Sequence, residues 1–217
     1  MSRIILFTLA LLHLTIPSAH AAEDARYRLE LDITWSQATH PVDWPEAGGH
    51  MSGLIGVTHN SRYIMFGDGR TATSGLKLLA ENGRATIMRA EFTEADRRDR
   101  IGAIFSAGGL AAVPGKMTAE FTVSGSHPFV SFVTMIAPSP DWFTGVAALP
   151  LSQGGQWANS VRVPLWAWDA GTDNGLNYRS KNQETQPAES TRLLATPHFL
   201  AEDGLKAMGY ATLTKIE

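Results

Sequence analysis

The fold is decided first by residues 27–35, which run Tyr27-Arg28-Leu29-Glu30-Leu31-Asp32-Ile33-Thr34-Trp35. Every odd position in this stretch is apolar, and every even position is polar. Because successive side chains of a strand point to opposite faces of a sheet, the alternation predicts a half-buried β-strand. One face of that strand is expected to lie on the core and the other in water.

Further strands are predicted along the rest of the chain. Residues 129–136 are almost continuously β-branched or aromatic between two prolines, which is typical of a strand buried on both faces. Weaker patterns predict strands at residues 63–66, 86–88, 116–123, 193–196 and 210–216. Glycine-rich turns separate these segments. Many short strands joined by such turns favour an all-β fold of the β-sandwich type.

Helical patterns are scarce. Residues 76–81 are expected to form one or two helical turns ended by Gly83, and residues 94–105 to form a second short helix. No internal repeat, low-complexity tract or linker interrupts residues 22–217. Residues 22–217 are therefore expected to form a single domain.

The N-terminus has the pattern of a secretory signal peptide. Arg3 precedes an apolar run over residues 4–16, and Ala19-His20-Ala21 supplies small residues before a cleavage site. The apolar run is shorter than the roughly 18 residues that a membrane-spanning helix needs. We expect residues 1–21 to be removed between Ala21 and Ala22, and the remainder to be secreted, to a periplasm or outside the cell. An uncleaved N-terminal anchor is the alternative.

Composition and charge exclude several functions. The chain carries 18 Lys and Arg residues against 21 Asp and Glu residues, a net charge of −3. This balance argues against a nucleic-acid-binding protein, because such proteins need a basic face. The absence of cysteine excludes disulfides, thiolate metal sites and cysteine nucleophiles.

Two carboxylates, Asp169 and Asp173, stand in a loop that is too rich in glycine to be a helix. Oxygen ligands of this kind suit hard cations such as Ca²⁺. The residue order does not match an EF-hand loop, so a calcium site would need a ligand from another loop. Asp141, which follows directly on the buried strand at residues 129–136, is the natural donor. The alternative is that these aspartates form turns and caps through their own hydrogen bonds.

Several short segments follow, in order, the pattern of one known family. They are Asp32-Ile33-Thr34-Trp35-Ser36, Thr39-His40-Pro41, His50-Met51-Ser52, Leu54-Ile55-Gly56-Val57-Thr58-His59-Asn60, Leu79-Ala80-Glu81-Asn82-Gly83, Val130-Ser131-Phe132, Thr134-Met135-Ile136-Ala137-Pro138-Ser139-Pro140-Asp141-Trp142-Phe143-Thr144-Gly145 and Asp169-Ala170-Gly171-Thr172-Asp173-Asn174-Gly175. The chain thus resembles the spondin domain, the module of F-spondin and mindin that also occurs alone in bacterial secreted proteins. The resemblance runs from about Tyr27 to Thr196.

The resemblance implies an antiparallel β-sandwich similar to a C2 domain, with one calcium ion held by aspartates from two loops. Carried onto this chain, the ligands are Asp141, Asp169 and Asp173. The favoured hypothesis is a secreted, non-catalytic binding or adhesion protein whose ligand is a surface protein, a matrix component, a glycan or a lipid, and we expect it to be a monomer. The chain lacks the cysteines and thrombospondin-type repeats of animal members, which leaves open whether their integrin or matrix binding applies.

Other interpretations of the residues remain. His40, His50 and His59 could meet on zinc if loops brought them together, although hydrogen bonding at loops and strand ends is the simpler role. A hydrolase acting through a histidine and a carboxylate is a second alternative, but the chain has no Gly-x-Ser-x-Gly elbow. A structural subunit of a surface assembly is a third. Exposed tryptophans among Trp142, Trp166 and Trp168 could stack on sugars or enter a lipid interface, whereas core packing is their ordinary role.

Overall fold

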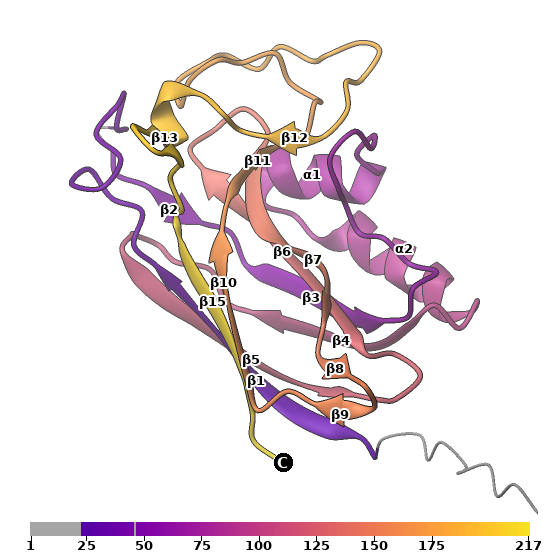
Figure 1. Ribbon diagram of the computed structural model, residues 1–217. Helices are drawn as coiled ribbons and strands as arrows, with labels where there is room; N and C mark the ends of the chain where they lie inside the picture. The colour runs from indigo at the N-terminus through magenta and orange to yellow at the C-terminus, as the bar shows by residue number, and fades with distance from the viewer. Residues whose placement is uncertain (1–22, 46) are drawn as a thin grey trace, which may run out of the picture.

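Two antiparallel β-sheets packed face to face make up most of the computed structural model, which describes residues 23–45 and 47–217 (Figure 1). The predicted signal peptide and its cleavage site lie outside the described residues. The smaller sheet has the strand order β10-β15-β1-β5. Its strands are β10 (Ser160–Leu165), β15 (Gly209–Lys215), β1 (Ala25–Ile33) and β5 (Gly115–Val123).

The larger sheet has the order β12-β11-β7-β6-β3-β4, with β2 (His50–Met51) paired to β6. Its other strands are β12 (Arg192–Leu193), β11 (Ala167–Asp169), β7 (Trp142–Pro150), β6 (Phe129–Ala137), β3 (Leu54–His59) and β4 (Ile101–Ala107). Two small hairpins pair β8 (Ser152–Gln153) with β9 (Gln156–Trp157) and β13 (Leu200–Ala201) with β14 (Gly204–Leu205). The all-β sandwich expected from the sequence is confirmed.

The alternation in residues 27–35 orients β1 as predicted. Tyr27, Leu29, Leu31 and Ile33 are fully buried between the sheets, while the intervening side chains lie on the outer face of the smaller sheet. Burial of these four side chains stabilises the sandwich by roughly 1.5–3 kcal/mol each. The predicted strands at residues 116–123 and 210–216 also form, as β5 and β15.

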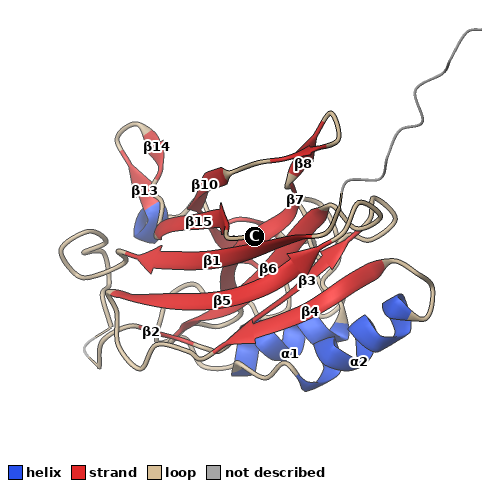
Figure 2. Cartoon of the chain, turned by 90° about the horizontal axis from the view of Figure 1, so that it is seen from below, coloured by secondary structure: helices blue, strands red, loops and turns tan. Residues whose placement is uncertain are grey.

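The centre of the larger sheet is buried on both faces, as the continuous apolar run predicts. In β6, Phe132 and Ile136 pack into the core between the sheets, whereas Val133 and Met135 pack into a second core under the helices. Figure 2 shows α1 (Ser74–Asn82) and α2 (Thr86–Asp96) lying together along that face. The molecule is therefore a three-layer structure in this region, with β6 at the meeting point of two cores.

The first helix is correctly predicted. Thr73 caps α1 by accepting a hydrogen bond from the Leu76 backbone N–H, and Gly83 ends it with a left-handed φ of 67°. Only glycine adopts this conformation without steric cost, which explains why the helix stops there.

Several local predictions are wrong. Residues 86–88 form the start of α2 rather than a strand, because Met88, Phe92 and Ala95 recur at helical spacing and pack on the larger sheet. Helix α2 ends at Asp96, so only the first residues of the helix predicted at 94–105 are helical. The rest form a turn followed by β4. Residues 63–66 form an irregular segment whose Met65 and Phe66 side chains fill the helix-covered core.

One end of the sandwich carries most of the long loops, and we call it the loop end. It comprises residues 34–45 and 47–49, the turn between β6 and β7, and residues 170–208 (Figure 1). Of the predicted strand at residues 193–196, only Leu193 lies in a strand, β12. Within residues 23–45 and 47–217, no helix has the length and apolar character needed to cross a membrane.

Candidate functional site

The three predicted aspartates lie in two loops that meet at the loop end. Asp141 closes the turn between β6 and β7, Asp169 is the last residue of β11, and Asp173 lies in the loop that follows. Because β7 and β11 are paired, with Trp142 opposite Asp169, the two loops leave the sheet side by side. The topology therefore brings the loop of Asp141 next to the loop of Asp169 and Asp173, as the prediction of Asp141 as the additional ligand requires.

A serine shapes the turn that carries Asp141. The Ser139 hydroxyl donates to the Ile136 carbonyl at 2.6 Å and accepts from the Trp142 backbone N–H at 3.1 Å. The turn is thus closed by a side chain across its own ends, and Asp141 is 0% exposed beneath it.

The Asp141 carboxylate ties the two loops together through one of its oxygens. Its Oδ2 accepts hydrogen bonds from the backbone N–H groups of Thr172 at 2.7 Å and Asp173 at 3.0 Å, and from the Thr172 hydroxyl at 3.2 Å. Its Oδ1 is buried and has no hydrogen-bond partner. A buried carboxylate oxygen left unpaired is costly unless another group, such as a cation, satisfies it.

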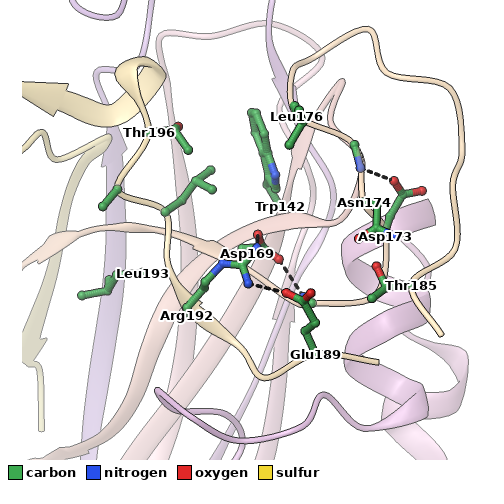
Figure 3. Close-up of a pocket in the computed structure, with 14 residues that line it drawn as sticks. Trp142, Asp169, Asp173, Asn174, Leu176, Thr185, Glu189, Arg192, Leu193 and Thr196 are labelled. Carbon is green, nitrogen blue, oxygen red and sulfur yellow. Dashed lines mark hydrogen bonds and ion pairs between the residues drawn. The ribbon is translucent and has the colours of Figure 1, made fainter. Parts of the chain in front are cut away.

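Asp169 is satisfied on both oxygens. Its Oδ1 accepts from the Gly171 backbone N–H at 2.7 Å, and its Oδ2 accepts from the Arg192 guanidinium at 2.8 Å (Figure 3). Arg192 lies opposite Asp169 in the β11–β12 pair, so this ion pair is a cross-strand contact. A second nitrogen of the same guanidinium contacts Glu189 at 2.6 Å.

Asp173 organises its own loop. Its Oδ1 accepts from the Gly175 N–H at 2.8 Å and its Oδ2 from the Gln183 N–H at 2.9 Å. The bonds from Asp169 to Gly171 and from Asp173 to Gly175 both span two residues, which is the Asx-turn geometry that the sequence offered as the alternative. Asp169 and Asp173 therefore both have the turn-forming role.

The glycine between them is required by the backbone. Gly171 has φ of +72°, and a Cβ placed on it would lie 2.6 Å from the Glu189 carbonyl oxygen. The turn after Asp169 therefore packs directly on the segment that carries Glu189 and Arg192.

Burial raises the pKa values of the two innermost carboxyl groups, Asp141 and Asp169. Burial, followed by the negative charge of Asp169, raises the pKa of Asp141 to about 6, against the opposing effect of the N–H groups of Thr172 and Asp173. Burial also raises the pKa of Asp169, while the Gly171 N–H and Arg192 act in the other direction. Asp169 has Arg192 as its counter-charge, whereas the charge of Asp169 disfavours ionisation of Asp141, so the negative charge is least balanced at Asp141.

A cavity of about 440 Å³ opens beside these groups. Asp169, Asp173, Glu189 and Arg192 line it, together with Trp142 (Figure 3). Asp141 is not among the residues that line the cavity, because it is fully buried. The carboxylates that reach the cavity, those of Asp169, Asp173 and Glu189, are hard oxygen donors of the kind that Ca²⁺ prefers.

Of the three predicted ligands, Asp141 and Asp169 suit a metal ion better than Asp173. Asp141 has a free buried oxygen, and Asp141 and Asp169 interact electrostatically, whereas both oxygens of Asp173 already accept backbone hydrogen bonds. Across residues 23–45 and 47–217, no group of three or more His, Asp or Glu side chains is arranged to hold a metal ion. Carboxylate rotation and backbone carbonyls would have to complete the ligand shell.

The three histidines considered for zinc have separate environments. His40 contacts Thr39 and packs on Phe199, and His50 is an exposed residue of β2. His59 is buried, with Nδ1 2.9 Å from the Asn60 carbonyl oxygen and Nε2 2.8 Å from the Ser131 hydroxyl. His40 and His59 therefore have the loop and strand-end contacts expected of structural histidines.

The tryptophans beside the acidic loops are mainly packing residues. Trp142 is buried against Tyr178 and Phe199. Trp168 is half-buried between Phe66 and Phe143. Their ordinary packing role is thus the one that the fold uses.

Sequence reasoning missed the polar residues contributed by the segment after the acidic loop. Arg192 and Glu189 enter the site only because β12 pairs with β11, and nothing in the local sequence signals that pairing. Thr172 lies inside the predicted loop, but its hydrogen bonds to Asp141 depend on the contact between the two loops.

Comparison with known proteins places this arrangement in context. The family described as Spondin_N matches residues 25–202. Spondin-2 of Rattus norvegicus is 36% identical over 169 residues, which cover 76% of this chain and 51% of the relative. Spondin-1 of Gallus gallus is 36% identical over 186 residues, covering 81% of this chain and 23% of the relative. The chain thus spans about half the length of Spondin-2 and less than a quarter of Spondin-1.

Proposed function

Since the chain belongs to the Spondin_N family, we propose that it is a secreted, calcium-binding module that binds a ligand on a cell surface or in a matrix and has no catalytic role. The observation that carries the calcium part is the buried Asp141 Oδ1, which has no partner and lies near a second buried carboxylate, Asp169. The family membership supports the binding and adhesion part.

The three aspartates have distinct roles in binding calcium in this proposal. Asp141 and Asp169 supply the inner carboxylates, one from each loop, and Asp173 joins them after exchanging a backbone hydrogen bond. Calcium supplies the positive charge that neutralises these groups and cross-links the two loops. Asp141 also holds the loops in register through its bonds to Thr172 and Asp173.

The role of the site is structural support for a binding surface. The acidic side chains each accept backbone N–H groups that fix the loops, which suits scaffolding better than proton transfer. The ligand is proposed to be a surface protein, a glycan or a lipid headgroup that contacts the loop end. Because this chain spans only part of its curated relatives, the partners of the whole relatives are not transferred to it.

Thermal unfolding of the secreted chain in calcium and in chelator tests the site. A ligand that binds only the folded state at a hundred times its dissociation constant stabilises it by about 2.7 kcal/mol. For a chain of this size, that corresponds to a rise in Tm of roughly 5–10 °C. An equal Tm in calcium and in chelator would contradict the proposal.

A double variant and a matched control locate the effect. Asp169→Asn with Asp173→Asn should abolish the calcium-induced rise in Tm, because it removes two of the three carboxylates. Glu30→Gln with Glu120→Gln removes the same charge from the outer face of the smaller sheet and should leave the rise intact. A full rise in the aspartate double variant would refute the ligand assignment.

Ligand binding is tested with the same proteins. Labelled wild-type chain should be retained on a glycan array, on anionic vesicles or on intact cells in calcium, and released by chelator. The aspartate double variant should not be retained in either calcium or chelator. Retention that is unaffected by chelator would separate ligand binding from calcium and overturn the proposed link between them.

A further inference from the structure

Arg192 places a positive charge inside the acidic site. Its guanidinium contacts the Asp169 Oδ2 at 2.8 Å and the Glu189 carboxylate at 2.6 Å, and all three side chains line the same cavity (Figure 3). The side chain of Asp169 is only 8% exposed, whereas that of Arg192 is 53% exposed. The arginine is thus anchored on a buried acid but keeps a route to solvent.

We propose that Arg192 is a built-in competitor of calcium, which holds Asp169 when the ion is absent and lowers the calcium affinity of the site. This inference rests on the proposed calcium site and assigns its regulation. The guanidinium and the ion compete for the same carboxylate, and Glu189 retains the arginine when Asp169 is taken by calcium.

The competition follows from charge and donor geometry. A guanidinium presents donors in a rigid fork that matches carboxylates well, so releasing Asp169 has a free-energy cost that calcium binding must offset. Any positive charge that stays beside the ion also repels it. Both effects weaken binding, toward the dissociation constants of about 10⁻⁴–10⁻³ M that are typical of extracellular calcium modules.

The same contacts connect the metal site to the rest of the cavity wall. The Glu189 backbone N–H donates to the Gly171 carbonyl at 2.8 Å, and Gly171 follows the Asp169 turn without space for a side chain. The turn after Asp169 is thus in direct contact with residues 189–192, which gives an ion at Asp169 a route to affect this segment.

Calcium titration calorimetry on variants of Arg192 tests the proposal. Arg192→Gln removes the charge and should bind calcium about tenfold more tightly, since a charge of this kind a few ångströms from the ion contributes on the order of a tenfold change in affinity. Arg192→Lys keeps the charge but loses the fork that contacts both Asp169 and Glu189, so its calcium affinity should lie between those of wild type and Arg192→Gln. It separates the contribution of the charge from that of the fork.

Thermal unfolding separates competition from simple structural support. In chelator, Arg192→Gln should have a lower Tm than wild type, because it loses its pairing with Asp169, yet its calcium-induced rise in Tm should be larger. A residue that merely positions Asp169 would lower both quantities when it is removed. Equal or weaker calcium binding by Arg192→Gln overturns the proposal.

A measurement on the wild-type chain keeps the inference testable if Arg192→Gln fails to fold. The side-chain N–H resonances of Arg192 should shift during a calcium titration with the same midpoint as the calorimetric isotherm. Unchanged resonances in a chain that binds calcium would overturn the competitor role alone. A wild-type chain that binds no calcium would instead refute the proposed site.

Discussion

The outer face of the smaller sheet and the loop end differ in how their charged side chains are placed: they are exposed and paired on the first, whereas the second includes a buried carboxylate with an unpaired oxygen. On the outer face, Glu120 contacts Arg26 at 2.6 Å and Arg28 at 2.8 Å, and Lys116 contacts Glu30 at 2.9 Å. These side chains are well exposed. At the loop end, Asp141 is buried with an unpaired oxygen.

The difference shows which polar groups of the molecule reduce the free energy of unfolding. Exposed ion pairs contribute little to stability, because water already solvates both partners. Buried polar atoms without partners are expensive and are rare in folded proteins. Four of the five side-chain atoms that lack a hydrogen bond of good geometry in the described residues lie at the loop end: Trp35 Nε1, His40 Nε2, Asp141 Oδ1 and Tyr178 Oη. Trp35 and Tyr178 interact with each other, and His40 interacts with the Lys206 backbone. Asp141 Oδ1 is therefore the atom of this group with the clearest unmet need for a partner.

The largest expected effect is the contribution of His40 to a loss of stability in acid, which Asp141, whose pKa is raised to about 6, opposes. Burial lowers the pKa of His40 to about 4, against a smaller opposing effect of the Lys206 backbone. Between the unfolded value near 6.5 and the folded value, the unfolded chain binds a proton that the folded chain does not. His40 therefore removes up to about 3 kcal/mol of stability as the pH falls through this window.

Denaturant unfolding in chelator at pH 7.5, 6 and 5 measures this effect. In His40→Asn, the decline in unfolding free energy should be shallower than in wild type, whatever its absolute stability. His50→Asn, at an exposed position of β2, is the control and should keep the wild-type slope. A wild-type slope in His40→Asn would contradict the assignment of the acid sensitivity to His40.

Asp141→Asn is expected to have the next largest effect, and its sign depends on the metal. An amide avoids a buried charge at neutral pH, so the variant should be more stable than wild type in chelator by about 2 kcal/mol. In saturating calcium the order should reverse, because the variant has lost an inner carboxylate. Denaturant unfolding at pH 7.5 in each condition checks the crossing, and a variant that is destabilised in chelator would count against it.

Glu120→Gln should have the smallest effect. It removes the acid that pairs with Arg26 and Arg28 on the outer face, where exposed pairs contribute little. We expect a change in Tm of less than about 2 °C and the same calcium response as wild type. A larger destabilisation would weaken the contrast between the two regions, since the exposed face would then also depend on its charges.

The sequence predicted the framework well because period-two and continuous apolar patterns act locally. β1 and β6 could be assigned, and even the two-sided burial of β6 followed from its composition. The strands predicted at residues 63–66 and 86–88 are wrong, because a few apolar residues suit a strand, a helix or a loop equally well until the core that they fill is known. Their partners are Leu76, Phe92 and other residues of a core formed only in three dimensions.

The candidate site was predicted in its acids but not in its balance of charge. Asp141, Asp169 and Asp173 stand in recognisable segments, and the loops do meet. The unpaired Asp141 oxygen, the hydrogen bonds that occupy Asp173, and the presence of Arg192 depend on strand register and side-chain rotamers. No pattern within either loop carries that information.

The position of β6 has a mechanical consequence. The turn that bears Asp141 leads directly from β6, which is paired with β7 on one side and, on the other, with β3 over Phe129–Val133 and with β2 at Ile136 and Ala137. The C-terminus lies at the opposite end of the molecule (Figure 1). The C-terminal strand β15 belongs to the smaller sheet, whereas β6 belongs to the larger one. Tension between a ligand at the loop end and that terminus must therefore pass from one sheet to the other, so that the apolar core between the sheets carries part of the load as well as the strand ladders.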